Sequence, residues 1–100
     1  MKYVAVQHPV TGTIEFHCSM LKKHEEIAAP YVARGYTARS AAFLRFLPGE
    51  RFETFGQSTS LGLGPHADDA RMLSAFYSAT LREGGYVPSE PSAKPVFVDA

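Results

Sequence analysis

The sequence predicts an α+β fold of order ββαββα, with a four-stranded, largely antiparallel sheet and two helices on one face of it. Three observations lead to this prediction. Four short runs are rich in β-forming side chains or show alternating side chains, which is typical of strands. Two other stretches place apolar residues three and four positions apart, which is typical of helices. Clusters of glycine and proline separate these runs and predict turns.

The first two strands are expected to form an antiparallel hairpin. Residues 2–8 (KYVAVQH) are rich in β-forming side chains, and residues 13–18 resume a strand after the turn cluster PVTG. Alternation places Ile14, Phe16 and Cys18 on one face of the second strand, which we expect to be the buried face.

A helix is predicted for residues 19–35, with Ser19 as its N-terminal cap. Pro30 has no backbone N–H, so the helix is expected to end or kink near Ala29. One side of the helix is expected to carry Leu21, His24, Ile27 and Ala28, and the other side carries Lys22, Lys23, Glu25 and Glu26.

Residues 36–47 (YTARSAAFLRFL) favour a helix by composition. We nevertheless predict a strand, because side chains alternate along it and Pro48-Gly49 is a typical central pair of a type II turn. The turn leads directly into a second strand, which begins at Arg51 and is expected to run to Leu61, where glycines and a proline interrupt it.

The second predicted helix begins with Asp68 and Asp69, because carboxylates favour the positive end of a helix. Two glycines end it after Arg82. Residues 1–85 are therefore predicted as a single α+β domain, and residues 86–100, which contain three prolines, as a Pro-rich C-terminal tail that is either mobile or strapped against the body by Val96, Phe97 and Val98. The apolar stripe of the helix consists of Ala70, Leu73, Phe76, Tyr77 and Leu81.

Composition argues against several classes of function. The 100 residues have a formal net charge of zero, so no bulk attraction to nucleic acid or to a membrane is expected. No apolar run is long enough for a transmembrane helix, and the N-terminal apolar stretch is too short for a signal peptide. Cys18 is the only cysteine, which favours a cytoplasmic location.

Four segments resemble small uncharacterised proteins that are encoded in proteobacterial prophages and other mobile elements. The resemblance extends over residues 1–75 and implies a bacterial or phage accessory protein without an assigned reaction. It transfers no catalytic residue. The segments are MKYVAV, the His24 helix with Ile27-Ala28, the strand Ser40-Ala41-Ala42-Phe43, and Gly56-Gln57-Ser58-Thr59-Ser60-Leu61 followed by Asp68-Asp69-Ala70.

The histidines and the cysteine come nearest to a metal site or a nucleophile. A zinc site needs about four convergent ligands, but His17 and Cys18 are adjacent in a strand and point to opposite faces. Adding His8, His24 and His66 gives no recognisable spacing, so we expect no metal and no cofactor. We expect Cys18 in the core and the histidines at the surface; the alternative is a reactive Cys18 with His24 as its base.

Two surfaces are candidate binding sites. The first is the polar edge formed by Gln57, Ser58, Thr59 and Ser60, whose hydroxyls precede a helix N-terminus and would suit an anion. The Walker and dinucleotide motifs are incomplete there, and the two aspartates that begin the helix would repel a phosphate. The second is a nucleic-acid-binding face on which bases would stack between cations. That face consists of Arg39, Phe43 and Arg45.

The leading prediction is a non-enzymatic binding or regulatory protein that acts through protein–protein contacts, most simply as a homo-oligomer. It rests on the absence of a complete catalytic constellation in the sequence and on the edge strands of an antiparallel sheet. Two alternatives stay open. One is nucleic-acid binding through the arginine face, and the other is a small enzyme or anion-binding protein that uses Cys18 or residues 56–64.

Overall fold

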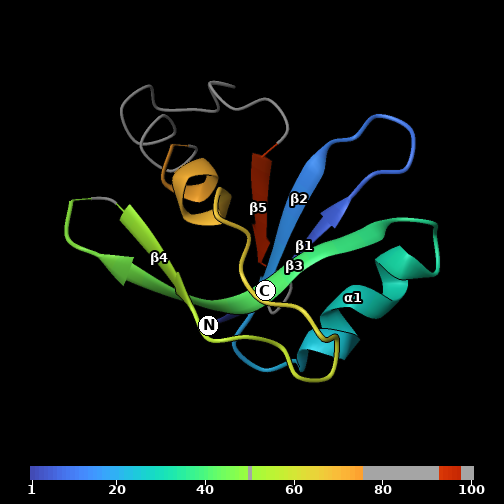
Figure 1. Cartoon of the computed structure of the whole chain (residues 1–100), viewed down its shortest axis with the longest axis horizontal. Coiled ribbons are helices and arrows are strands. Elements are labelled where there is room, and N and C mark those ends of the chain that lie inside the picture. The colour runs from blue at the N-terminus through green and yellow to red at the C-terminus, as the bar shows by residue number, and fades with distance from the viewer. Residues whose placement is uncertain (50, 76–92, 98–100) are drawn as a thin grey trace.

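The structure is a computed structural model of the 100-residue chain, and it describes residues 1–49, 51–75 and 93–97. Its centre is a five-stranded sheet with the strand order β4-β3-β1-β2-β5 (Figure 1). A helix, α1 (His24–Val32), follows the second strand, and residues 69–75 are the described part of a second helix. The strands are β1 (Lys2–Gln7), β2 (Ile14–Ser19), β3 (Thr37–Leu47), β4 (Arg51–Phe55) and β5 (Ala93–Phe97).

The α+β class, the ββαββα order and the four antiparallel strands are confirmed. β1 pairs antiparallel with β2 and β3, and β3 pairs antiparallel with β4. β5 is added beside β2 in parallel orientation, so the sheet has one strand more than predicted. It lies within residues 86–100, where the sequence predicted a tail. Residues 76–85 of the predicted second helix lie outside the described residues.

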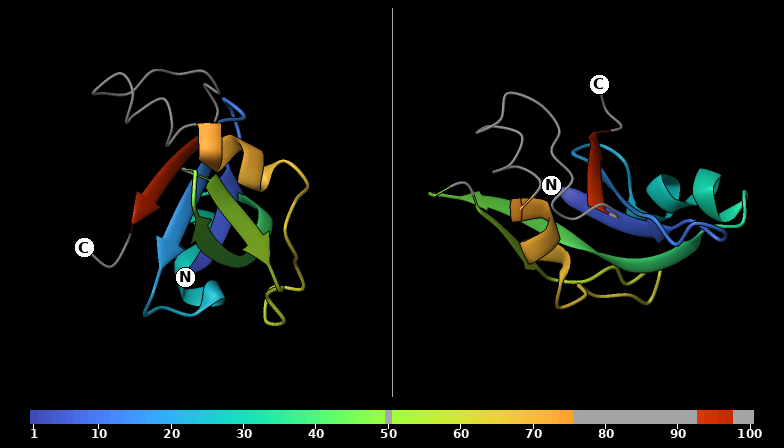
Figure 2. Two further views of the ribbon diagram at one scale, coloured as in Figure 1. Left: turned by 90° about the vertical axis from the view of Figure 1, so that its left-hand side faces the viewer. Right: turned by 90° about the horizontal axis from the view of Figure 1, so that it is seen from above.

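The two helices pack on opposite faces of the sheet, so the prediction that both lie on one face is wrong (Figure 2). The reason is that β1 sends apolar side chains to both faces and needs a cover on each. The cluster on the α1 side consists of Val4, Val6, Ile27, Ala28 and Ala41. The cluster on the other side consists of Tyr3, Ala5, Ile14, Phe16, Cys18, Ala42, Leu44, Met72 and Leu73.

The first helix is shorter than predicted at its start and continues past its proline. α1 begins at His24, because the Ser19 hydroxyl accepts backbone N–H groups of the loop before the helix. Pro30 lies within α1, which continues to Val32, since only one backbone bond is lost near the end of the helix. Leu21, predicted within this helix on the side of Ile27 and Ala28, lies in the loop before it and is exposed.

The strand prediction for β3 is confirmed, and so is the hairpin with β4. Gly49 has a φ of +84°, as the third position of a type II turn requires. β4 ends at Phe55 rather than at Leu61, because Gly56 adopts a φ of +69° and turns the chain. Residues 56–64, called the corner below, then fold back along the edge of β3.

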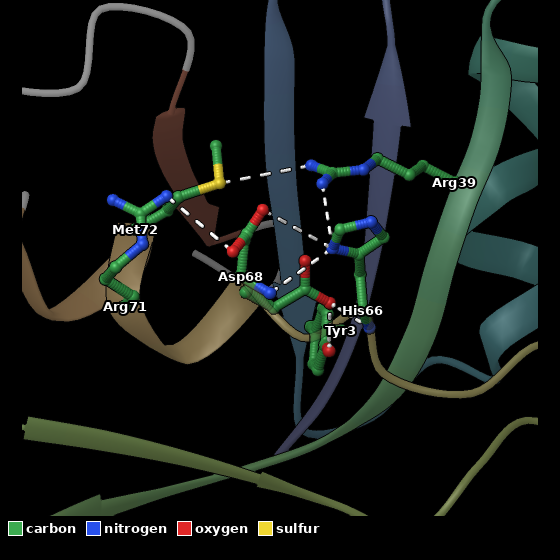
Figure 3. A network of polar contacts seen from close by, with 7 residues as sticks. Tyr3, Arg39, His66, Asp68, Arg71 and Met72 are labelled. Atoms are coloured by element: carbon green, nitrogen blue, oxygen red, sulfur yellow. Dashed lines mark hydrogen bonds and ion pairs between the residues drawn. The ribbon is translucent and has the colours of Figure 1, made fainter.

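A buried hydrogen bond ties the first strand to the start of the second helix (Figure 3). The Tyr3 hydroxyl donates to Asp69 Oδ2 at 2.6 Å, and both side chains are fully buried. The same oxygen accepts the backbone N–H of His66 at 2.9 Å. Burial, followed by the bond to Asp69, raises the pKa of the Tyr3 hydroxyl, which therefore stays a donor. The sequence predicted Asp69 only as a helix-start residue and missed this role.

Removal of the Tyr3 hydroxyl is expected to destabilise the fold. Tyr3→Phe should lower the free energy of unfolding by about 2 kcal/mol, because the buried carboxylate loses a donor and stays desolvated. Urea denaturation measures the change. Tyr36→Phe is the matched control, since it removes a hydroxyl from a half-buried ring and should change stability by less than about 0.5 kcal/mol. Equal stability of Tyr3→Phe and the unmodified protein would contradict a structural role for the bond.

Candidate functional site

The structure separates Arg39 from the other residues of the predicted nucleic-acid-binding face. A β-bulge interrupts the pairing of β1 with β3 at this point. The Arg39 guanidinium reaches His66 Nδ1 at 2.9 Å and Met72 Sδ at 3.9 Å (Figure 3). Met72 belongs to the core cluster opposite α1, whereas Phe43 contacts α1 through the ring of His24. Arg39 therefore does not lie beside Phe43.

The Arg39 contact also defines the tautomer of His66. Its Nδ1 faces the Arg39 guanidinium and the backbone N–H of Asp68, at 2.9 and 3.2 Å. Both groups can only donate, so Nδ1 accepts and the ring carries its proton on Nε2. Arg39 thus holds the strand edge to the loop that leads to Asp69, and its role in this arrangement is structural.

Phe43 and Arg45 do come together, in a stack on the α1 side of the β3–β4 hairpin. Phe43 lies opposite Phe55 in the strand register, and their rings stack with centres 5.7 Å apart. The Arg45 guanidinium lies 4.3 Å from the centre of the Phe55 ring. Its Nε donates to Glu53 Oε1 at 3.0 Å. A nucleic-acid base would have to displace Arg45, and a phosphate would meet Glu53, so this geometry favours protein contacts.

The β3–β4 hairpin exposes one aromatic ring on each of its faces. Phe55 is 38% exposed on the α1 side. Phe46 is 55% exposed on the opposite side, where it meets the ring of Phe52 edge-on at 5.4 Å. The two rings belong to different cross-strand pairs, Phe43–Phe55 and Phe46–Phe52, so each face of the hairpin offers its own exposed apolar ring.

β4 is the outermost strand on one side of the sheet, and no further strand of the described residues pairs with it. The N–H of Phe52 points away from β3 and donates to Ser74 Oγ at 2.9 Å. Alternate residues of an antiparallel strand point their N–H groups to the same side, so the N–H of Thr54 also faces outward. We call this region the hairpin surface, and it consists of Arg45, Phe46, Glu53, Thr54 and Phe55.

The polar corner predicted as a ligand site is hydrogen-bonded to α1. Ser58 is buried, and its Oγ lies 3.4 Å from that of Ser60, which donates to Glu25 Oε2 at 2.6 Å. The Ser60 bond lowers the pKa of the Glu25 carboxyl, so the group facing the hydroxyls is negatively charged. Gln57 and Thr59 are exposed. An anion at these hydroxyls would meet the Glu25 carboxylate.

The corner is joined to the aromatic stack at Gly56. A side chain at this position would place its Cβ 2.9 Å from the Phe43 ring, whereas Gly62 has a similar φ of +67° and no atom within 4 Å. Gly56→Ala should therefore lower the free energy of unfolding by about 1–2 kcal/mol more than Gly62→Ala. Urea denaturation of both variants separates the clash from backbone strain. Equal losses would show that Phe43 does not pack against the corner.

Cys18 lies in the core, as predicted, on the face opposite α1. Its proposed base, His24, lies in α1, with Nε2 2.8 Å from the carbonyl oxygen of Ala42. The sheet thus separates the two groups, and burial raises the pKa of the Cys18 thiol to about 12. A reactive thiolate is not supported. The prediction of surface histidines is wrong for His17 and His24, which are both buried.

The raised pKa of Cys18 makes stability dependent on alkaline pH. Above the ordinary thiol value of 9.0 the unfolded chain loses a proton that the folded chain keeps until about pH 12, so stability falls as the pH rises. The free energy of unfolding should fall by about 1 kcal/mol between about pH 9 and 10. In Cys18→Ala most of this loss should disappear; a smaller loss should remain, because the pKa values of the Tyr3 and Tyr31 hydroxyls are also raised and both groups begin to ionise in the unfolded chain below pH 10.0. Identical pH profiles from urea titrations would contradict the assignment.

Other kinds of site find little support. Among the described residues, no three histidine, cysteine, aspartate or glutamate side chains lie together so as to hold a metal ion. No helix in the described part of the chain has the length and apolarity needed to cross a membrane. Comparison with family models, with curated proteins and with solved structures finds no match. The resemblance to prophage proteins stays a prediction.

Proposed function

We propose that the chain is a non-enzymatic, cytoplasmic accessory protein that self-associates through its hairpin surface. One observation carries the proposal: exposed Phe46 and Phe55 flank an edge strand whose Thr54 N–H faces outward. Edge strands with open backbone groups pair with further strands, and exposed aromatic rings supply the apolar area that such pairing buries.

The charges of the hairpin surface favour a second copy of the chain as the partner. Arg45 and Glu53 place both signs beside the exposed rings, so a two-fold interface can oppose unlike charges without a foreign partner. The chain has a formal net charge of zero, so two copies do not repel each other in bulk. Arg45 is already held over the Phe55 ring, and Cys18 is buried. Both observations support protein binding rather than nucleic-acid binding or catalysis.

Sedimentation equilibrium over a wide concentration range tests self-association. The weight-average mass should rise from 10.9 kDa towards twice that value. Phe55→Ser should weaken association about tenfold or more, because a central aromatic anchor is lost. Phe46→Ser should also weaken association, because Phe46 supplies exposed apolar area on the opposite face of the hairpin.

Val10→Ser is the matched control. Val10 is 86% exposed in the turn between β1 and β2, away from the β3–β4 hairpin. Its replacement should therefore leave the dissociation constant unchanged. Circular dichroism checks that all variants are folded. A monomeric mass at the highest concentration, or equal association of the folded Phe55→Ser variant, would contradict the proposal.

A further inference from the structure

A second aromatic cluster lies at the C-terminal end of α1, apart from the hairpin surface. Tyr31, in the last turn of α1, and Tyr36, just before β3, have ring centres 5.6 Å apart and an interplanar angle of 70°. The two rings therefore form the walls of a second corner, which is separate from residues 56–64 and is the corner meant below. Arg34, in the turn between them, holds its guanidinium carbon 5.6 Å from each ring centre. A cation of the chain itself thus already occupies this corner.

The walls are held in place by rings from other elements. The His17 ring, from β2, stacks on Tyr31 at a centre distance of 3.9 Å. The His8 ring, which follows β1, meets Tyr36 edge-on at 5.0 Å. Because His17 is buried and β1 and β2 are paired, Tyr31 and Tyr36 are preorganised before any ligand binds.

Negative charge lies behind the same corner. Glu15, on β2, places Oε1 2.9 Å from His17 Nε2, and its side chain is partly exposed. Burial and then the nearby Glu15 charge raise the pKa of the Tyr31 hydroxyl, whereas Arg34 lowers it. The carboxylate therefore acts on the ring that forms the first wall, and the corner combines aromatic faces with an attractive field for cations.

Two aromatic faces at a steep angle with a carboxylate nearby are the arrangement that recognises alkylated ammonium groups. Arg34 is exposed, and at 5.6 Å it lies close to the outer limit of about 6 Å for such contacts, so a ligand can displace it. We propose that Tyr31 and Tyr36 bind a quaternary or methylated ammonium group, and that Arg34 fills the corner when no ligand is present. The proposal does not depend on self-association.

Titration of the full chain with tetramethylammonium chloride, followed by NMR, tests this site. The ring resonances of Tyr31 and Tyr36 should shift and saturate. Ammonium chloride at the same ionic strength carries the same charge without methyl groups and should not produce these shifts. Choline and a trimethyllysine peptide are titrated in the same way. The ligand that saturates the shifts at the lower concentration shows whether the ammonium group comes from a small molecule or from a methylated protein.

Variants separate recognition by the ring faces from other causes. Arg34→Ala removes the internal competitor and should tighten binding roughly two- to fivefold. Tyr36→Leu should weaken binding by a similar or larger factor, whereas Tyr36→Phe keeps the ring face and should bind like the unmodified protein. Absence of saturable shifts in folded Arg34→Ala, or equal shifts with ammonium chloride, would overturn the proposal even if Tyr36→Leu failed to fold.

Discussion

The buried hydrogen bond between Tyr3 and Asp69 joins parts of the chain that are 66 residues apart, and the rest of the structure depends on it. It holds the second helix against the face of the sheet that α1 does not cover. From that position Ser74 accepts the N–H of Phe52 in β4, whereas the N–H of Thr54 has no partner of this kind among the described residues. Asp69 Oδ1 is buried with no hydrogen bond within the described residues, so the bond to Tyr3 offsets part of the cost of burying the carboxylate.

The features that were predicted correctly depend on neighbours in the sequence. Alternation in β2 and β3 and the pair Pro48-Gly49 are local patterns, and they were sufficient for the α+β class and both hairpins. The opposite placement of the helices was missed although its signal was present. Every residue from Tyr3 to Val6 is apolar, which is typical of a strand that is buried on both faces. The parallel partner of β2 comes from the far end of the chain, where the apolar run at Val96 and Phe97 indicates contact with the body but not which strand it joins.

The candidate site was predicted only in part because it is built across strands. The sequence paired Arg45 with Phe43 by alternation, but it omitted Phe55 and Glu53, which the turn at Gly49 brings opposite them. Counting outward from that turn would have found both residues. The bulge that separates Arg39 follows from tertiary pairing and has no sequence signal. The β3–β4 hairpin and the C-terminal end of α1 share one feature. At each of them an arginine of the chain itself lies over aromatic rings and occupies the position where an outside group would contact those rings.

The open edge of β4 is the basis of the proposed self-association, and amide hydrogen exchange measured at several protein concentrations tests it most directly. Pairing of this edge with a second copy predicts that protection of the Thr54 N–H rises with concentration. The N–H of Phe52, which is bonded to Ser74 within the same chain, serves as the internal control and should exchange at a constant rate. A Thr54 N–H that exchanges equally fast at all concentrations would contradict self-association through β4.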